Sequence, residues 1–76
     1  MEYRKGLWVT VGGRVGILND LDVRASLGKV HFVDAEGCTE SIVGDVPFGA
    51  IAQAAWLDIP APRRPDEEMA RAFGYL

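Results

Sequence analysis

The sequence predicts a small, mostly β domain in which five short strands close into a barrel and a short helix follows at the C-terminus. Alternating runs of β-branched, aromatic and polar residues recur along the first two thirds of the chain. Glycine-containing turn signals separate these runs. The chain has 76 residues, of which 49% are hydrophobic and 25% charged. This length and mixture are typical of one globular domain with a small core.

The first hairpin is predicted over residues 7–18. Residues 7–11 alternate and are rich in strand formers, Gly12-Gly13 is a turn signal, and residues 14–18 return. From the alternation we expect Trp8 to lie on the outer face of the barrel. The residues expected to share the inner face are Leu7, Val9, Val11, Val15 and Ile17.

A second hairpin is predicted after a loop over residues 19–27. Residues 29–34 form an alternating strand, residues 35–37 form a tight turn, and residues 38–43 pair back. Within the first of these strands, His31 points to the side opposite Phe32.

Residues 44–57 are predicted to contain a turn, one turn of 3₁₀ helix and a closing strand. Gly44 to Pro47 is a turn, because Pro47 cannot donate in a central strand. Residues 48–50 suit a 3₁₀ turn. Residues 51–57 fit either a strand or a short helix; we predict a strand, because closing the barrel removes an exposed edge.

The C-terminal segment is predicted to be an extended connector and a short helix. Prolines stiffen residues 58–65, and a helix follows over residues 66–73, with Gly74 at its C-terminal end. A helix this short is unstable alone. We therefore expect residues 1–58 to form the barrel and residues 59–76, the tail, to pack on it.

Several motifs resemble known small barrels. The strand pattern resembles the SH3-like barrel, and residues 5–17 (KGLWVTVGGRVGI) resemble the opening of KOW domains. Nearly the whole chain resembles small uncharacterised proteins of this type that tailed phages and prophages carry. The residues that carry this second resemblance are Val30–Asp34, Val46-Pro47, Gln53-Ala54, Ile59-Pro60, Arg63-Arg64-Pro65 and Gly74-Tyr75-Leu76. It implies a fold and a genomic context, but no activity.

Residues that could carry catalysis or bind metal are scarce. His31 and Cys38 are the single histidine and the single cysteine. Paired across the hairpin they could make a thiolate nucleophile, but nothing in the sequence supplies an orienting group or an oxyanion hole. Two such residues are also too few for structural zinc. We expect no enzyme activity, no catalytic residue, no cofactor and no metal.

The charge balance argues against generic nucleic-acid binding. Eight Lys and Arg stand against eleven Asp and Glu, a net charge of −3, whereas phosphate binding needs a basic face. A KOW-like nucleic-acid surface would use Lys5, Arg14 and Lys29 beside Trp8. A single cysteine fits a reducing compartment, and no apolar run has the length of a membrane span. We expect the cytoplasm of a bacterial host, or a virion, and no membrane partner.

The spare aromatic residues allow two interpretations. In the first, the tail wraps back so that Trp8 stacks against Ile59, Met69 or Phe73. In the second, an exposed aromatic patch anchors a protein partner. Dimerisation through the same patch would satisfy both. The candidate protein-binding residues are Trp8, His31, Val33, Trp56, Tyr75, Arg63 and Arg64.

The function expected from these observations is that of a non-enzymatic, phage-type protein-binding module. It would be a virion accessory part or an effector that binds a host factor. The alternatives are a KOW-like nucleic-acid-binding domain and a homo-oligomeric structural protein. Residues 60–65 could be a polyproline ligand for a partner, but a stiff connector is the simpler interpretation.

Overall fold

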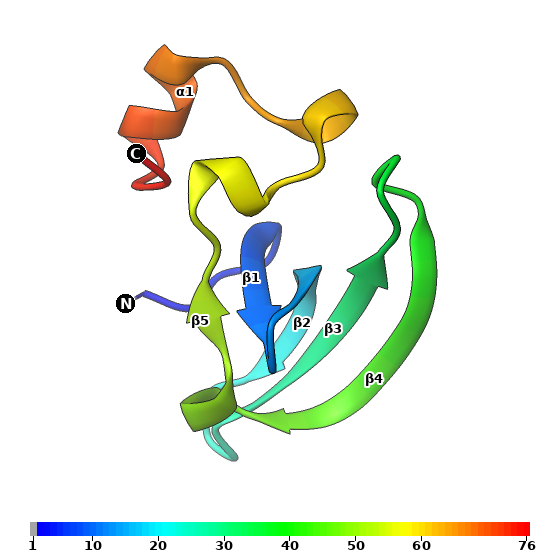
Figure 1. Cartoon of the computed structure of the whole chain (residues 1–76). Coiled ribbons are helices and arrows are strands. Elements are labelled where there is room, and N and C mark those ends of the chain that lie inside the picture. The colour runs from blue at the N-terminus through cyan, green and yellow to red at the C-terminus, as the bar shows by residue number, and fades with distance from the viewer. Residues whose placement is uncertain (1) are drawn as a thin grey trace.

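Five antiparallel strands form one curved sheet in the computed structural model, which describes residues 2–76 (Figure 1). Met1, the first residue of the expected 1–58 domain, lies outside the described residues. The strands are β1 (Leu7–Val11), β2 (Arg14–Asp22), β3 (Leu27–Val33), β4 (Thr39–Pro47) and β5 (Ala52–Gln53), in the order β4-β3-β2-β1-β5. The mostly β fold class is confirmed. Within the described residues β4 and β5 are the two edges, so strand pairing does not close the sheet into the expected barrel.

The first hairpin has the predicted turn but a different arrangement of faces. Gly12 and Gly13 both have positive φ, and the two-residue turn pairs Val11 with Arg14. Odd-numbered residues of β1 therefore face even-numbered residues of β2. The prediction that Val15 and Ile17 share the inner face was wrong: they lie opposite Thr10 and Trp8. The inner positions of β2 belong to Gly16 and Leu18.

Strands β2 and β4 are longer than the sequence predicts. The expected loop over 19–27 is reduced to a turn between β2 and β3, and the expected turn over 44–47 is part of β4. Register shifts near Asp20 and Gly44 let both strands continue through residues that look like turn formers. Pro47 is tolerated because it is the last residue of an edge strand.

The closing strand is present but short. Ala52 and Gln53 pair with Thr10 and Val9, and the 3₁₀ turn η1 (Phe48–Ala50) precedes them as predicted. The rest of the expected 51–57 strand gives way to a second 3₁₀ turn, η2 (Trp56–Asp58). The Asp58 side chain accepts a hydrogen bond from the Ala55 N–H at 3.0 Å, which fixes the start of this turn.

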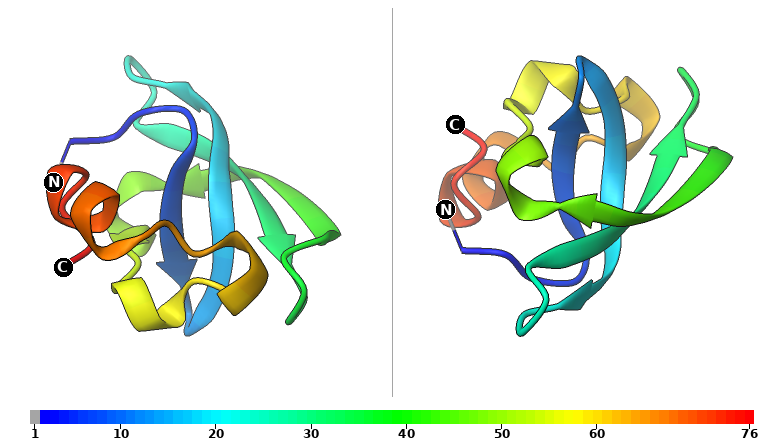
Figure 2. Two further views of the ribbon diagram at one scale, coloured as in Figure 1. Left: turned by 90° about the horizontal axis from the view of Figure 1, so that it is seen from above. Right: turned by 90° about the horizontal axis from the view of Figure 1, so that it is seen from below.

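The tail folds back across one face of the sheet. It contains a 3₁₀ turn, η3 (Ala61–Arg63), where an extended connector was expected, and the helix α1 (Glu67–Ala72). Asp66 caps this helix by accepting from the Met69 N–H at 2.8 Å. Figure 2 shows the tail passing over β1 and β2. No helix within residues 2–76 is long and apolar enough to cross a membrane.

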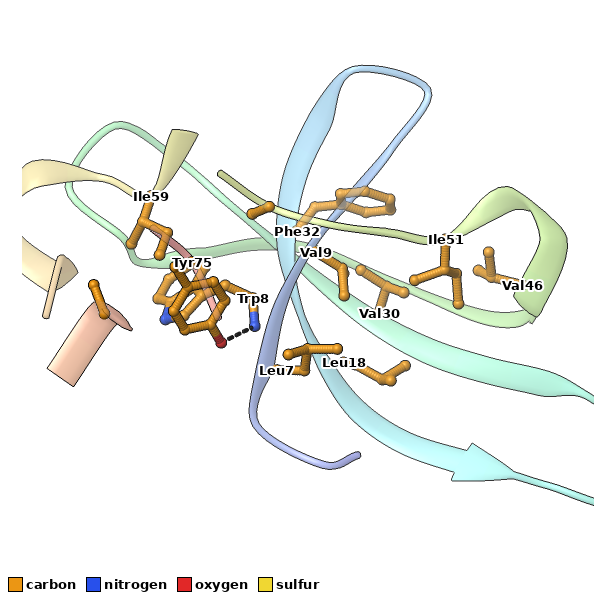
Figure 3. Packing of buried hydrophobic residues seen from close by; sticks show 12 residues of the cluster. Leu7, Trp8, Val9, Leu18, Val30, Phe32, Val46, Ile51, Ile59 and Tyr75 are labelled. Carbon is orange, nitrogen blue, oxygen red and sulfur yellow. Dashed lines mark hydrogen bonds between the residues drawn. The ribbon is translucent and has the colours of Figure 1, made fainter. Parts of the chain in front are cut away.

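The buried residues form one cluster that includes part of the tail (Figure 3). Ile59 and Ala70 are fully buried, and Tyr75 is 8% exposed. The tail thus supplies apolar surface that a small sheet lacks. The remaining members of the cluster are Leu7, Trp8, Val9, Leu18, Val30, Phe32, Val46, Ile51 and Ala54.

Deleting residues 66–76 should lower the free energy of unfolding by about 3–5 kcal/mol, because it removes the buried side chains of Ala70 and Tyr75. The tryptophan emission of the folded protein should shift to the red as water reaches Trp8. Urea titration followed by fluorescence measures both effects. Deleting only Leu76, which is 56% exposed, is the control and should change neither quantity. An unchanged midpoint in the longer deletion would show that the tail does not stabilise the sheet.

Candidate functional site

A pocket of about 270 Å³ lies where the tail meets the chain leading into β1. Its lining comes from residues 4–8 and from two parts of the tail, residues 63–65 and 73–75. The fold back of the tail therefore creates this pocket. The lining residues are Arg4, Lys5, Gly6, Trp8, Arg63, Pro65, Phe73 and Tyr75.

Trp8 and Tyr75 form the buried part of the pocket. The Trp8 backbone N–H donates to the Tyr75 hydroxyl oxygen at 2.9 Å (Figure 3), and both residues are 8% exposed. The interpretation of Trp8 as an exposed anchor is therefore wrong, because the tail covers it. Burying the indole stabilises a small core more than leaving it in water. Ile59 joins it in the buried cluster, while Met69 and Phe73 stay about half exposed.

Arg63 links the tail to the turn between β3 and β4. Its guanidinium lies 5.5 Å from the centre of the Trp8 ring, and its Nη1 donates to the Gly37 carbonyl at 2.7 Å. The side chain lies so close over Gly37 that a Cβ there would collide with Cγ of Arg63. This arginine, predicted as a binding residue, thus has a structural contact on one side and lines the pocket on the other.

Arg64 and Trp56 hold η2 rather than form an open surface. The Arg64 guanidinium donates to the carbonyls of Trp56, Leu57 and Ile59 at 2.9–3.3 Å and lies 5.1 Å from the Trp56 ring centre. The Trp56 indole N–H donates to the Pro65 carbonyl at 2.7 Å. Both residues therefore satisfy backbone and ring groups within residues 56–65.

His31 and Val33 lie on β3, away from the residues that line the pocket. In the sheet, His31 stands between Ile17 and Ile42, and Ile17 pairs in turn with Trp8. Val33 is half-buried against the core. Nε2 of His31 is buried without a hydrogen-bond partner among the described residues. Among the paired residues Trp8, Ile17, His31 and Ile42, only Ile42 is exposed, by 55%, and it lies on the edge strand β4.

Lys5 contributes charge at the rim of the pocket. It pairs with Asp20 at 3.5 Å, and its side chain remains 69% exposed. The pKa of Asp20 lies below its ordinary value, because the Leu21 N–H donates to the carboxylate and Lys5 lies beside it. An exposed pair of this kind contributes little to stability and leaves the ammonium accessible to an anion.

The other two residues of the expected nucleic-acid surface lie elsewhere. Arg14 lies 4.2 Å from the Phe32 ring centre and donates to the Ser41 hydroxyl at 3.2 Å. Lys29 lines a second pocket, which has three carboxylates in its lining. The structure does not gather the expected cations into one surface. The acidic residues around Lys29 are Asp20, Asp22 and Asp45.

Four residues that line the pocket were not predicted as binding residues: Gly6, Pro65 and the two with charged or aromatic side chains, Arg4 and Phe73. Arg4 lies beside Lys5 in the sequence, and its Nη2 donates to the Phe73 carbonyl at 3.5 Å. Phe73 belongs to the apolar stripe of the C-terminal helix, which suggested packing alone. The adjacent pair of cations was the available signal, but only the folded tail brings Phe73 to it.

The pocket combines three cations with three aromatic rings and has no acidic residue in its lining. Within residues 2–76, no group of three or more His, Cys, Asp or Glu side chains is placed to hold a metal ion. Comparisons of the chain with protein-family models, with curated proteins and with solved structures find no match. The chemistry of the pocket is therefore inferred from its charge and its hydrogen-bonding groups.

Gly37→Ala should destabilise the protein more than Gly13→Ala. Both glycines have φ close to +80°, so the backbone strain is the same, but the space around Gly13 is open and that around Gly37 holds Arg63. We expect an additional loss of about 1–3 kcal/mol for Gly37→Ala, measured by urea unfolding. In an Arg63→Ala background the difference between the two variants should become much smaller, because, of the side-chain atoms of residue 63 near Gly37, only Cβ, at 3.3 Å, remains. Equal losses in the parent chain would show that Arg63 does not close over the turn.

Replacing His31 with Ile should raise the free energy of unfolding by about 1 kcal/mol, because it removes a buried, unpaired nitrogen from a position between Ile17 and Ile42. His31→Gln keeps a polar side chain and serves as the control, with no gain expected. Thermal unfolding compares the two. A loss of stability in His31→Ile would mean that the imidazole makes an interaction that its surroundings do not explain.

Proposed function

We propose that the protein is a non-enzymatic protein-binding module whose pocket receives an anionic segment of a partner protein. The observation that carries this proposal is the composition of the lining. Arg4, Lys5 and Arg63 line the pocket with no acidic residue among them, in a chain whose net charge is −3. An anion is the complement of such a lining.

The cations keep hydrogen-bonding capacity for a ligand. A guanidinium has five N–H donors, of which Arg63 uses one on Gly37 and Arg4 uses one on Phe73. Lys5 is largely exposed. An anionic partner can therefore bind without breaking the contacts that hold the tail.

The acidic surface elsewhere on the chain supports the same proposal. The second pocket contains three aspartates beside one lysine, so it repels an anionic segment. Attraction at one pocket and repulsion at the other orient the partner as it approaches.

The resemblance to small barrel proteins of tailed phages and prophages fits a binding module. We propose that the chain acts as a virion accessory part, or in the cytoplasm of a bacterial host as an effector that binds a host factor. The KOW-like nucleic-acid role has less support, because Lys5, Arg14 and Lys29 do not line one pocket.

The test measures binding of labelled peptides to the protein by fluorescence anisotropy. Three pools of random peptides with free C-termini are compared: one is rich in Asp and Glu, one in Ser and one in Lys. The acidic pool should bind best, and binding should weaken with salt. Arg4→Gln/Lys5→Gln should reduce binding about tenfold or more. The control, Arg24→Gln/Arg71→Gln, removes the same charge at residues that line neither pocket and should leave binding unchanged.

Three results would overturn the proposal. If no pool binds, the pocket does not receive protein segments. If both double variants lose binding equally, net charge and not the pocket is responsible. Short RNA and DNA are titrated in parallel. If they bind more tightly than every peptide pool, the nucleic-acid alternative replaces the proposal.

A further inference from the structure

We infer that the group seated in the pocket is the free C-terminal carboxylate of the partner chain, with a large apolar side chain on its last residue. This inference rests on the proposed function and specifies its ligand.

Five of the eight backbone carbonyls of the lining residues already accept a hydrogen bond, including that of Trp8, which accepts from the Ala54 N–H. The Phe73 carbonyl accepts from Arg4 and from Gln53 Nε2, and the Pro65 carbonyl accepts from the Trp56 indole. A peptide running through the pocket would bring backbone N–H groups, and these oxygens, already bonded, offer them less acceptor capacity than free carbonyls would. Two further carbonyls of the lining, those of Arg4 and Tyr75, accept from Leu7 N–H and Trp56 N–H.

Two polar hydrogens of the lining residues, in contrast, have no acceptor within residues 2–76. The Tyr75 hydroxyl accepts from the Trp8 N–H, so its own proton remains to be donated, and no acceptor for it is found within residues 2–76. The Trp8 indole N–H also has no partner among these residues, and the pocket is bordered by Arg4, Lys5 and Arg63. Donors without acceptors match a carboxylate, which only accepts when ionised.

The apolar wall selects a terminal residue rather than an acidic side chain. Phe73 is 45% exposed, and Pro65 is the other apolar residue without a polar side-chain group in the lining. At a C-terminus the carboxylate and the side chain leave the same carbon, so one residue can reach both the cations and this wall. A volume of about 270 Å³ is small for a drug-sized ligand and suits one such residue. Capture of a terminal carboxylate is an established mode of peptide recognition.

The experiment records ¹⁵N–¹H correlation spectra of the full chain during titration with N-acetyl-Gly-Phe as the free acid. Its C-terminal amide and N-acetyl-Ala-Glu-Ala-amide are titrated in parallel. The two indole N–H signals report the site. The Trp8 signal should move on binding, and the Trp56 signal, whose proton is held by Pro65, should move less. The free acid should bind about tenfold more tightly than either amide.

Two variants of matched exposure test the apolar wall. Phe73 and Met69 are 45% and 47% exposed on the same C-terminal segment, but only Phe73 lines the pocket. Phe73→Ala should weaken binding of the free acid about fivefold or more, and Met69→Ala should leave it unchanged. If the two substitutions weaken binding equally, Phe73 does not contact the ligand's apolar side chain, and that part of the inference is overturned.

The failure of this inference differs from the failure of the proposed function. If N-acetyl-Gly-Phe and its amide bind equally, or the internal glutamate peptide binds more tightly, the terminal carboxylate is not the ligand. Tighter binding of the glutamate peptide would leave the proposed function intact, because that peptide is itself an anionic segment. If none of the three probes moves the Trp8 signal, the inference is also overturned. The proposed function is then decided separately by the peptide pools.

Discussion

The hydrogen bond between the Trp8 N–H and the Tyr75 hydroxyl is the contact on which the rest of the structure depends. Strand β5 pairs with Val9 and Thr10 only, and its continuation bonds the Trp8 carbonyl through the Ala54 N–H. The Trp8 N–H therefore has no strand beside it. A buried backbone donor without a partner is costly, and a side chain from the end of the tail supplies the acceptor.

This contact explains why the chain continues beyond the sheet. A short sheet with an unpaired donor and an exposed indole would lose both hydrogen-bonding and apolar burial energy. The tail corrects both defects by placing Tyr75 and Ile59 in one buried cluster with Trp8. Arg63 then ties the tail to the turn at Gly37. The pocket lies between the folded-back tail and residues 4–8, so it exists only when the tail is in place.

Local signals explain what the sequence predicts well. Gly12-Gly13 fixes the first turn through its positive φ, and Asp66 and Gly74 mark the two ends of the C-terminal helix. The prediction of which residues share a face of the first hairpin was wrong, because a two-residue turn pairs odd-numbered residues of β1 with even-numbered residues of β2. Strand β4 extends beyond its predicted end at residue 43, because a proline is acceptable at the end of an edge strand.

The candidate site could be predicted only in part. Lys5, Trp8, Arg63 and Tyr75 were identified from their residue types, yet the sequence could not say that two of them are buried. Arg64 and Trp56 resemble surface anchors in a proline-rich segment, but their partners are carbonyls of neighbouring turns. Phe73 reaches the pocket only after the tail has crossed the sheet. These features depend on contacts between segments that are distant in the sequence, which local patterns do not encode.

Native-state hydrogen exchange of the Trp8 amide tests the central claim most directly. In the parent chain this amide should exchange as slowly as the slowest core amides. In Tyr75→Phe, which keeps the ring and removes the acceptor, it should exchange about tenfold faster relative to the amides of the β2–β3 ladder. Tyr3→Phe is the control, because the Tyr3 hydroxyl donates to the Phe48 carbonyl and not to any group of Trp8. This substitution should leave the ratio unchanged. An unchanged ratio in Tyr75→Phe would contradict the account, because the tail would then not hold the Trp8 N–H.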